Sequence, residues 1–539
     1  MAKQFDCDVI IVGLGPTGAL LANLLGQQGW SVVGLEREED LYYAPRAVHF
    51  DDEIMRVFQH AGLCEEISRS SEPFRDMEIT LKPRGKPVLH TLIGNQDLRF
   101  GHAGAWWFHQ PTLEKHFQDG MKRFARLTPI YGAEVQKVEQ DEDGATVTAT
   151  TRDGGTRSLR GRYVIGCDGG RSFVRREAGL ALDTADFDEA WVVVDTVTRT
   201  GRKHPDLPPC HRQTCDPKQP VTYVPLAGPY YEFQFMVMGD KTEREATDAV
   251  LVRQQLRDFV DLDTIDITRI AYYKFHALWA KKWRNGRVIL AGDSAHQMPP
   301  FLGQGMCSGV RDAISLSWRL DLVLQGKAAD SLIDHYEAER SAHVQHIIRG
   351  AMFLGNVIQT RNRAVAFLRN NLLFRPANAV PLLNRFFYSV ANRKRPLETG
   401  FFGRNRRRLA GTLALQPRVS RADGAAVLLD EVLGRGFAIL ARRGGVAGQG
   451  AAIATLRRQV QLPLKVVEFC TATGDECVGD AQGTLHRWFG EHDIDFVLIR
   501  PDRYIFDAGR AGELEAVLKQ LAQQYPGTSS SRFQLENAA

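Results

Sequence analysis

The stretch from Asp8 to Glu36, DVIIVGLGPTGALLANLLGQQGWSVVGLE, decides the fold of the N-terminal part of the chain. A β-branched run opens it, as in a buried parallel strand, and the glycine pattern GxGxxG follows at once. A helical stretch comes next, and a second apolar run ends in Glu36. This order of strand, glycine turn, helix, strand and acid predicts a dinucleotide-binding βαβ unit.

Each residue of this turn has a physical task. Gly13 permits the tight turn, Gly15 lets a pyrophosphate approach the backbone, and Gly18 lets the helix pack closely on the strand. The N-terminus of the helix then offers free N–H groups to the phosphates, and Glu36 offers its carboxylate to ribose hydroxyls. The pattern by itself does not decide between FAD and NAD.

Two distant segments add the motifs that decide this question. The strand-like run Tyr163 to Cys167 leads into Asp168-Gly169, and the run Arg287 to Ala291 leads into Gly292-Asp293. We expect the Asp293 carboxylate to hold a ribityl hydroxyl; the alternative is that it caps the following helix. The turn Gly303-Gln304-Gly305 then opens a helix whose backbone N–H groups suit an electron-poor flavin ring.

Together, in this order, the GxGxxG, DG and GD motifs resemble the single-component flavoprotein aromatic hydroxylases, over about residues 5 to 350. Within that family the chain looks similar to 3-(3-hydroxyphenyl)propionate hydroxylases and phenol hydroxylases, through PRAVHFDDE (45–53), FMVM (235–238) and the GQGMCSG loop (303–309). The resemblance implies FAD as cofactor and hydroxylation of a small phenolic substrate with O2 through a flavin C4a-hydroperoxide. NADH or NADPH would donate electrons transiently, because only one fingerprint is present; the sequence does not separate the two.

The resemblance also assigns cofactor contacts residue by residue. The family often has asparagine where this chain has Cys307 and Ser315, so only backbone contacts carry over there. The predicted FAD contacts are Gly13, Gly15, Pro16, Thr17, Gly18, Glu36, Arg37, Arg46, Gln110, Val135, Asp168, Asp293, Pro300, Gly303, Gly305, Met306 and Cys307.

Between Trp191 and Phe275 the pattern changes to short alternating or β-branched runs separated by Gly, Pro and Asp. This predicts a mixed or antiparallel sheet, which in the family forms a wall of the substrate cavity. Four aromatic residues are candidates for an aromatic pocket, and core packing is the alternative for each of them. They are Tyr223, Phe233, Phe235 and Tyr273.

The candidate catalytic residue is His49, three residues after Arg46. An imidazole beside the flavin would accept the phenol proton near neutral pH and so raise electron density at the carbon to be attacked. The alternative is a histidine that caps the following helix or bonds locally. Tyr231 and His276 are rival polar groups.

The last third of the chain, from about Gly400, shows four strand-like runs and an amphipathic helix from Ala511 to Gln523. The segment Asp495 to Phe506 resembles the thioredoxin-like C-terminal domain of phenol and resorcinol-type hydroxylases, although CxxC is missing. A packing or dimer-forming module without thiol chemistry is expected, so the whole chain could be a homodimer.

The predicted fold is α/β: a Rossmann-like FAD-binding domain, an inserted mixed β-sheet substrate domain and a thioredoxin-like C-terminal domain. The predicted ranges are 1–180 and 281–398 for the FAD-binding domain, 181–280 for the sheet, 399–526 for the C-terminal domain and 527–539 for a disordered tail.

Composition narrows the class of protein further. A net charge of +4 over 539 residues gives no reason to expect a nucleic acid or membrane partner, and no apolar run is long enough to cross a bilayer. The eight scattered cysteines suggest reduced thiols in a cytoplasmic protein.

Alternative functions that stay open are a hydroxylase of larger polyphenols or aromatic polyketides, and a flavin dehydrogenase. A halogenase is disfavoured because WxWxIP is missing, and a redox-silent binding module because the DG and GD motifs are intact.

Overall fold

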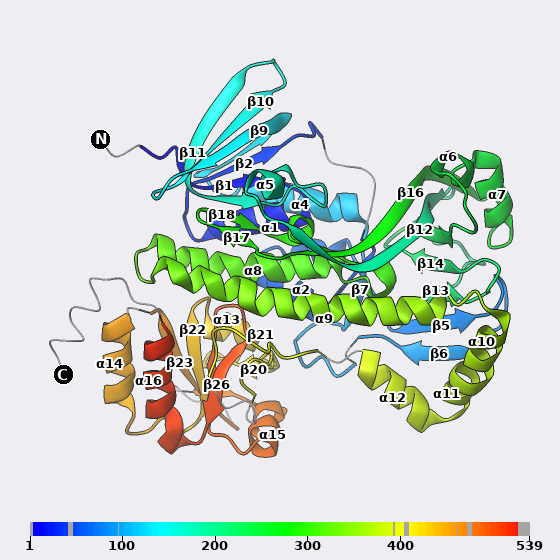
Figure 1. The fold of residues 1–539 in the computed structure, drawn as a ribbon. Helices are drawn as coiled ribbons and strands as arrows, with labels where there is room; N and C mark the ends of the chain where they lie inside the picture. Colours follow the sequence, from blue (N-terminus) through cyan, green and yellow to red (C-terminus); the bar gives the residue numbers. More distant parts are fainter. Residues whose placement is uncertain are drawn as a thin grey trace. The chain divides into compact units, whose positions relative to one another are not determined.

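The computed structural model describes residues 4–40, 47–94, 96–391, 394–403, 409–460, 462–471 and 477–525 (Figure 1). Arg46 and the tail 527–539, both named in the sequence predictions, lie outside these ranges. The chain divides into two compact units. The first comprises Met1–Gln96, Ala103–Val310 and Val344–Arg393, and the second comprises Asp97–His102, Arg311–His343 and Lys394–Ala539.

The first unit contains the predicted dinucleotide-binding sheet. Its parallel core runs in the order β18 (Val288–Leu290), β11 (Thr156–Gly166), β1 (Cys7–Val12), β2 (Val32–Glu36) and β8 (Leu127–Tyr131). The outer strands β17 (Arg284–Asn285), β9 (Ala133–Gln140) and β10 (Ala145–Thr151) pair antiparallel. Because β1, β11 and β18 are parallel, the three loops that carry the glycine turn, Asp168 and Asp293 leave the sheet at one edge.

Helices α1 (Pro16–Gln27), α4 (Gln110–Met121) and α5 (Phe173–Glu177) belong to the same part of the first unit. Helix α1 begins directly after Gly15, as the glycine pattern predicts, and its residues from Gly18 to Gly26 are all buried. Helices α1 and α4 lie side by side: Asn23 of α1 donates a hydrogen bond from Nδ2 to the Phe117 carbonyl oxygen at 2.9 Å.

The first unit contains a second sheet, which includes strands of the predicted segment between Trp191 and Phe275 and also strands from outside it. It has eight strands, all antiparallel except for the pair β13–β5. Their order is β19 (His296–Gln297), β16 (Ile265–Ala280), β12 (Leu182–Thr198), β15 (Tyr230–Met236), β14 (Val221–Pro225), β13 (His211–Thr214), β5 (Asp76–Thr80) and β6 (Leu89–Leu92).

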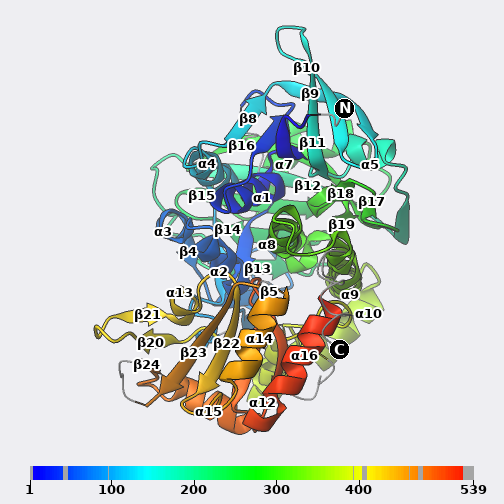
Figure 2. The same cartoon turned by 90° about the vertical axis from the view of Figure 1, so that its left-hand side faces the viewer.

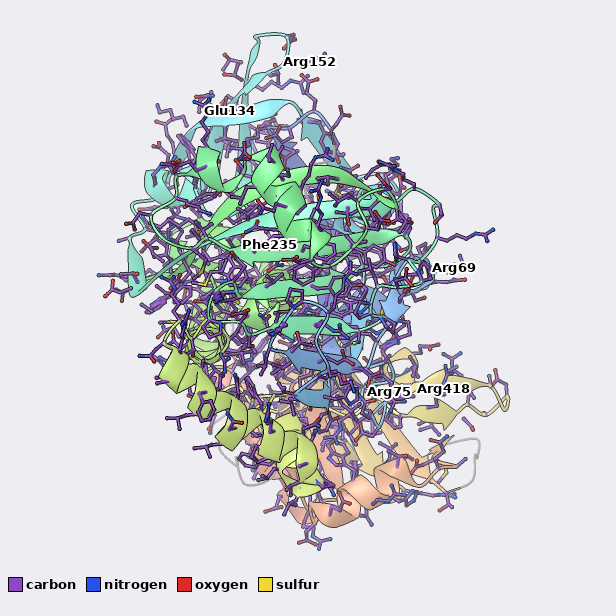
Figure 3. All side chains as sticks on the ribbon, turned by 90° about the vertical axis from the view of Figure 1, so that its right-hand side faces the viewer. Arg69, Arg75, Glu134, Arg152, Phe235 and Arg418 are labelled. Atoms are coloured by element: carbon purple, nitrogen blue, oxygen red, sulfur yellow. A yellow bond between two sulfur atoms is a disulfide. The ribbon has the colours of Figure 1, made fainter. Side chains whose placement is uncertain are left out.

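The two faces of this second sheet have different neighbours. One face packs its alternate residues in a core with Ala246 of α6 (Glu243–Ala246) and Val252 of α7 (Ala249–Arg257); Phe235, labelled in Figure 3, lies on this face. On the other face, Val224 packs against Trp107 of a small sheet. That small sheet consists of β3 (His49–Asp51), β7 (Ala105–Trp107) and β4 (Glu72–Pro73), and helices α2 (Asp52–His60) and α3 (Cys64–Arg69) follow β3 in the chain.

Two long helices follow, and each is shared between the two units: α8 (Gly305–Leu324) and α9 (Asp334–Ile358). The first unit ends with short helices that are bound by polar side chains to the edge strand β6 and to the residues that follow it. Asn384 Nδ2 donates to the His90 carbonyl oxygen at 2.6 Å, and Tyr388 donates from its hydroxyl to the Gly94 carbonyl oxygen at 2.9 Å. These helices are α10 (Arg363–Leu368), a π-helical segment (Arg369–Phe374), α11 (Arg375–Ala379) and α12 (Pro381–Ala391).

The second unit is built on a seven-stranded sheet (Figure 2). Its order is β21 (Ala426–Leu428), β20 (Arg418–Ser420), β24 (Cys477–Gly479), β23 (Leu464–Cys470), β22 (Phe437–Arg442), β25 (Phe496–Ile499) and β26 (Ile505–Gly509). Alternation along β22 sends Phe437 and Ile439 into one hydrophobic core and Ala438 and Leu440 into another. Besides its parts of α8 and α9, this unit contains the helices α13 (Leu429–Leu433), α14 (Gly450–Val460), α15 (Thr484–Glu491) and α16 (Leu514–Gln524).

A buried ion-pair network lies in the second unit. Arg500, with no exposed surface, donates from both Nη atoms to the two carboxylate oxygens of Glu339, at 2.8 Å each. The neighbouring guanidinium groups of Arg319 and Arg500 hold the pKa of Glu339 at about 2, against the effect of its burial. Trp318 of α8 donates its indole N–H to Asp502, which also accepts from Arg500. The network therefore fixes α8 and α9 residues of this unit to its sheet.

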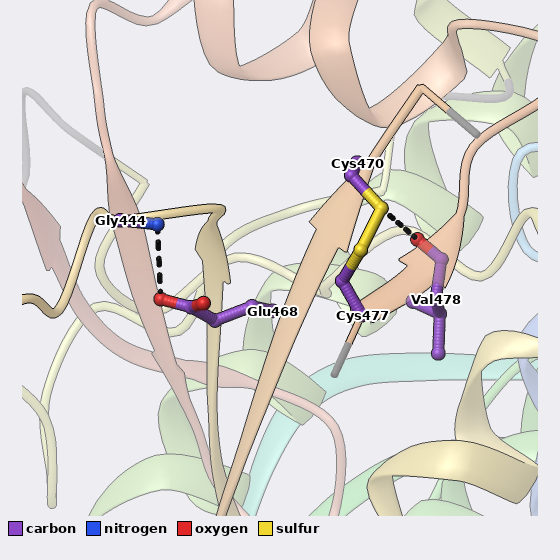
Figure 4. The surroundings of a disulfide bond; sticks show 5 residues. All are labelled: Gly444, Glu468, Cys470, Cys477 and Val478. Atoms are coloured by element: carbon purple, nitrogen blue, oxygen red, sulfur yellow. Dashed lines mark hydrogen bonds between the residues drawn. A yellow bond between two sulfur atoms is a disulfide. The ribbon is translucent and has the colours of Figure 1, made fainter. Parts of the chain in front are cut away.

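One expectation about the cysteines needs correction. Cys470, at the end of β23, and Cys477, at the start of β24, form a disulfide (Figure 4). Parallel pairing of these strands brings the two Cα atoms to 6.1 Å, which is within the range that a disulfide spans. Spacing in the sequence alone gave no sign of this pairing, because it depends on how β24 returns beside β23. The other six cysteines are free thiols.

Candidate functional site

The glycine turn after β1 is held by close packing. An added Cβ at Gly13, whose φ is +95°, would collide with the backbone of Cys167, and one at Gly18 would collide with the Gly13 carbonyl oxygen. At Gly15, by contrast, an added Cβ would meet nothing within 4 Å. Gly13 and Gly18 are thus required by the fold, while Gly15 leaves open space at the N-terminus of α1.

Glu36, at the end of β2, holds this turn as well as presenting its carboxylate. Its Oε2 accepts a hydrogen bond from the Leu14 backbone N–H at 2.8 Å, and Oε1 accepts from the Glu38 N–H at 3.0 Å. Arg37 is exposed and pairs with Glu38. The carboxylate is therefore fixed at the edge of the sheet by backbone donors, a contact that the sequence did not predict.

The DG and GD loops meet at the same edge. Asp168 accepts from the Ser172 hydroxyl at 2.5 Å and from the Val174 N–H at 3.0 Å, so it fixes the start of α5. Arg175, almost fully buried, donates to the carbonyl oxygen of Ser294 at 3.1 Å and so ties the two loops together. The Asp293 side chain is exposed, in a short 3-10 turn between Gly292 and Ser294.

His49 lies against the glycine loop that precedes α8. An added Cβ at Gly303, whose φ is +58°, would collide with Nδ1 and Cε1 of the His49 ring. The imidazole also makes edge contacts with Phe74 and Trp107, each at 6.2 Å between ring centroids. The cap of the following helix α2 is Asp51, which accepts from the Ile54 N–H, so His49 is not the capping residue.

The remaining predicted cofactor contacts fall into three groups. Gln110 is buried, and its side-chain amide is hydrogen-bonded at both ends. Its Oε1 accepts from the Ala47 N–H at 2.8 Å and its Nε2 donates to Glu114 at 2.6 Å. Val135 is a buried residue of β9, on the sheet that carries the glycine turn. The rest lie in or next to the glycine turn and the loop before α8, and they are Pro16, Thr17, Pro300, Gly305, Met306 and Cys307.

The structure does not bring Tyr231 and His276 to His49. Tyr231 is in the core under α6 and α7, where its hydroxyl accepts from the His204 N–H at 2.7 Å. His276 is half-exposed and pairs with Asp188 at 2.5 Å.

The predicted pocket aromatics are also divided between the two faces of the second sheet. Tyr223, Phe233 and Phe235 belong to the core under α6 and α7, whereas Tyr273 lies on the opposite face, beside Trp191 in the register of β12 and β16. Core packing, the alternative for each residue, describes the first three.

Two side chains near His49 were missed by sequence reasoning. Trp107 of β7 stacks on Phe74 at 3.5 Å and lies 6.1 Å from the ring of His211, at the start of β13. Burial, and to a lesser degree the neighbouring His49, lowers the pKa of His211 to about 4, so this imidazole is neutral at pH 7. No motif surrounds His211 in the sequence; only the strand pairing brings it here.

The residues of this edge fit FAD. The glycine turn leaves room for a pyrophosphate at Gly15, the exposed Asp293 carboxylate suits a ribityl hydroxyl, and Gly305 at the start of α8 has open space beside it. Within the described ranges no group of three or more His, Cys, Asp or Glu side chains is placed to hold a metal ion. In the same ranges, no helix is both long and apolar enough to cross a membrane.

The family profile described as FAD binding domain matches residues 6–351, well over half of the chain. The chain belongs to the FAD binding domain family. A second profile, described as HcaD C-terminal domain, matches residues 411–524 of this family member. The predicted membership among the flavoprotein aromatic hydroxylases is confirmed, with FAD as the cofactor.

Alignments with named relatives cover nearly all of this FAD binding domain protein. A 3-(3-hydroxy-phenyl)propionate/3-hydroxycinnamic acid hydroxylase from Mycolicibacterium smegmatis is 36% identical, covering 95% of this chain and 92% of the relative. A probable NADH-specific resorcinol 4-hydroxylase from Rhodococcus jostii is also 36% identical, covering 95% and 94%. The solved flavin-dependent monooxygenase PieE, in complex with FAD and substrate, superposes with a TM-score of 0.80 at 21% identity, covering 97% and 99%. Aklavinone-11 hydroxylase with FAD and aklavinone gives 0.78 at 21%, covering 97% and 100%; at such identities the likeness is one of fold.

Proposed function

We propose that this chain is an FAD-dependent monooxygenase that hydroxylates a phenolic compound with O2 and electrons from NADH or NADPH. The observation that carries the proposal is the position of His49 against Gly303, in the loop that opens α8 at the edge where the FAD motifs converge. Relatives of 36% identity named as hydroxylases of 3-hydroxyphenylpropionate and of resorcinol support the same reaction class. The NADH-specific name of one relative favours NADH as donor.

FAD, when bound, supplies the chemistry: it takes a hydride from the nicotinamide and activates O2 for transfer to the ring. The chain's own residues bind and orient. The N-terminus of α1 at Gly15 would bind the pyrophosphate, Asp293 would accept a hydrogen bond from a ribityl hydroxyl, and the N-terminal N–H groups of α8 would face the flavin ring.

His49 would hold the phenol proton. Its ring lies between Gly303 and the aromatic side chains of Phe74 and Trp107, so a flat substrate reaching the loop before α8 would meet an imidazole. Accepting the hydroxyl proton raises electron density at the ortho and para carbons of the ring, which favours attack by an electrophilic oxygen. Tyr231 and His276 remain weaker candidates, because both bond to other partners on other parts of the sheet.

The second unit would have no role in the redox chemistry. Strand order supports a thioredoxin-like module: β22 pairs parallel with β23 and antiparallel with β25, and β25 pairs antiparallel with β26. No CxxC accompanies it, so we propose a packing or dimer-forming role for residues 399–526, and a homodimer as the assembly. Because NADH and NADPH are intracellular cofactors, the proposed reaction belongs in the cytoplasm.

The test is a panel of phenols offered to the purified FAD-loaded protein. NADH and NADPH oxidation and O2 uptake should accelerate with a cognate phenol, and a hydroxylated product should appear in equal amount. A dehydrogenase would oxidise substrate without incorporating oxygen from O2, so 18O2 labelling of the product separates the two reactions. Larger polyphenols and aromatic polyketides belong in the panel as well. Two solved structures of similar fold carry the names aklavinone-11 hydroxylase and anhydrotetracycline hydroxylase, and the first of them holds aklavinone.

A further inference from the structure

Strand β15 carries two polar side chains, Glu232 and Gln234, on the sheet face opposite the α6–α7 core. The neighbouring strands show where this face leads. On β12, Trp191 lies 6.0 Å, ring to ring, from Phe301, two residues before Gly303. On β14, Val224 packs against Trp107, which contacts His49. Since β15 lies between β12 and β14, its polar pair belongs to the wall that faces His49 and the loop before α8.

Glu232 has an acidic neighbour directly across the strand pair. Asp195 is its register partner on β12, and both side chains are more than nine-tenths buried. Asp195 Oδ1 and Glu232 Oε2 accept no hydrogen bond from any side chain or backbone group that the structure describes. The guanidinium of Arg269 donates to the other oxygen of Asp195 and, at 2.6 Å, to the Tyr273 hydroxyl.

One cation beside two buried carboxyl groups leaves one negative charge in excess, and a shared proton removes it. Burial, with the charge of Asp195, raises the pKa of Glu232 to about 8, so at neutral pH Glu232 carries the proton. Protonated, Glu232 can donate to Asp195, and both buried oxygens are then satisfied. The charged groups that face Glu232 are Asp195 from β12 and Arg269 from β16; β14 presents the apolar Val224.

This arrangement fixes the amide of Gln234. Its Nε2 donates to Glu232 Oε1 at 2.5 Å, so its Oε1 is turned away from Glu232. The structure gives this Oε1 no hydrogen-bond donor among the described residues, and the side chain is only half-buried. A half-buried amide oxygen on this wall can accept a hydrogen bond from a hydroxyl and would repel a carboxylate.

We propose that Gln234 is a substrate-positioning residue, whose Oε1 accepts a hydrogen bond from a hydroxyl group, and that the substrate is an uncharged dihydroxybenzene of the resorcinol class. His49 would take the proton of one hydroxyl and Gln234 would hold the second. Among the described residues, a phenol that bears a carboxylate would meet no cation on this wall, since Arg269 is neutralised by Asp195 and His211 is uncharged. The inference rests on the proposed function and selects between the two kinds of substrate that the relatives' names offer.

The first experiment compares ligand affinity and turnover for resorcinol, phenol and 3-(3-hydroxyphenyl)propionate. Dissociation constants come from equilibrium dialysis of the oxidised FAD-loaded protein, so the readout does not depend on turnover. The unmodified protein should bind resorcinol at least tenfold more tightly than the propionate. If the propionate binds more tightly and is hydroxylated faster, the inference is overturned while the proposed function stands. If none of a wide panel of phenols is hydroxylated, the proposed function itself fails.

The second experiment uses Gln234→Leu, which keeps the volume and removes the acceptor. It should weaken resorcinol binding about tenfold, as for one lost hydrogen bond, with less than twofold effect on phenol. Phe233→Leu is the matched control: it changes the adjacent residue of β15, but on the α6–α7 face, and should leave the resorcinol-to-phenol ratio unaltered. Equal weakening for all ligands in Gln234→Leu, or no weakening, would overturn the assignment.

The third measurement tests the shared proton. Resorcinol binding should weaken as pH rises past about 8, because ionised Glu232 repels Asp195 and the position of Gln234 is lost. Glu232→Gln keeps an N–H donor for Asp195 and an acceptor for Gln234 at all pH values, so this pH-dependent component of binding should disappear. Glu232→Leu should behave like Gln234→Leu. A Glu232→Gln protein with an unchanged pH profile would contradict the role of Glu232.

Discussion

At the scale of single residues, the site depends on glycines that make room for other side chains. Gly303 has no side chain where the His49 imidazole lies, and its positive φ suits glycine. The sequence supplied both residues through the family pattern, yet the contact between them depends on how the loop before α8 packs against β3. His211 illustrates the limit: nothing local distinguishes it, and only the fold of β13 puts it near Trp107.

His49→Ala should keep bound FAD and divert most of the consumed NADH to hydrogen peroxide. Without the imidazole the phenol keeps its proton and its ring is less reactive. The activated oxygen is then released as hydrogen peroxide before it reacts with the substrate. The measurement is the ratio of hydroxylated product to NADH oxidised, with peroxide assayed in parallel. His276→Ala serves as control, since this imidazole pairs with Asp188 elsewhere on the sheet. Coupling as tight as in the unmodified protein would exclude His49.

Asp293→Ala should fold normally and lose FAD. The exposed carboxylate has its proposed partner in the ribityl chain, whereas Asp168 at the neighbouring loop holds α5 through Ser172 and Val174. We expect at least tenfold weaker FAD binding, measured by flavin absorbance after dialysis, with an unaltered far-ultraviolet circular dichroism spectrum. Full flavin occupancy would contradict the assignment of Asp293.

At the scale of elements, the alternating pattern predicts which residues of a strand share one face of the sheet, but not which of the two faces meets the substrate. Tyr223, Phe233 and Phe235 share one face, as period-two spacing predicts. The sequence cannot tell which face meets the substrate, because both faces of this sheet carry buried aromatic side chains, such as Phe233 on one face and Trp191 on the other. The polar residues of the opposite face, Glu232 and Gln234, would have been the better signal: buried polar side chains in a strand need a partner or a ligand.

The ion pairs of Glu339 in α9 with Arg319 of α8 and with Arg500, which directly follows β25, give a prediction for stability. Glu339→Gln should cost about 3–5 kcal/mol of unfolding free energy, because it leaves Arg319 and Arg500 buried without their shared carboxylate. Since the folded pKa of Glu339 is lowered, its contribution is present above about pH 4.5 and is lost as pH falls toward 2. Denaturant unfolding between pH 7 and pH 3 measures this loss, and the variant should show a flatter profile. Glu515→Gln, from an exposed i,i+4 pair, is the control and should unfold like the unmodified chain.

At the scale of the whole molecule, the sequence predicted the main sheets better than it predicted how the chain divides into compact units. Strands form where the sequence predicted them between Trp191 and Phe275 and in the C-terminal third, because these segments are regularly patterned; β5, β6 and β19, which complete the second sheet, come from elsewhere in the chain. The two compact units, however, exchange short segments: residues 97–102 and 311–343 belong with the C-terminal part. Such exchange follows from tertiary packing, here the burial of Trp318 and Leu322 in the C-terminal core, and no composition change marks it.

The cysteines of the second unit test whether this unit takes part in the chemistry. With no CxxC, Cys470→Ser/Cys477→Ser should leave FAD content and coupled hydroxylation nearly unchanged. Loss of the disulfide should lower the stability of the second unit by roughly 2–3 kcal/mol, the usual scale for closure of a short loop. Thiol titration of the denatured protein should count six free cysteines before reduction and eight after it, which also reports whether the pair forms in the expressed protein. Cys64→Ser, which removes a free thiol of the first unit, is the control for the substitution itself. A double variant that keeps its FAD and its fold but loses hydroxylation would give the disulfide a part in electron transfer, and the second unit could then no longer be regarded as a packing module.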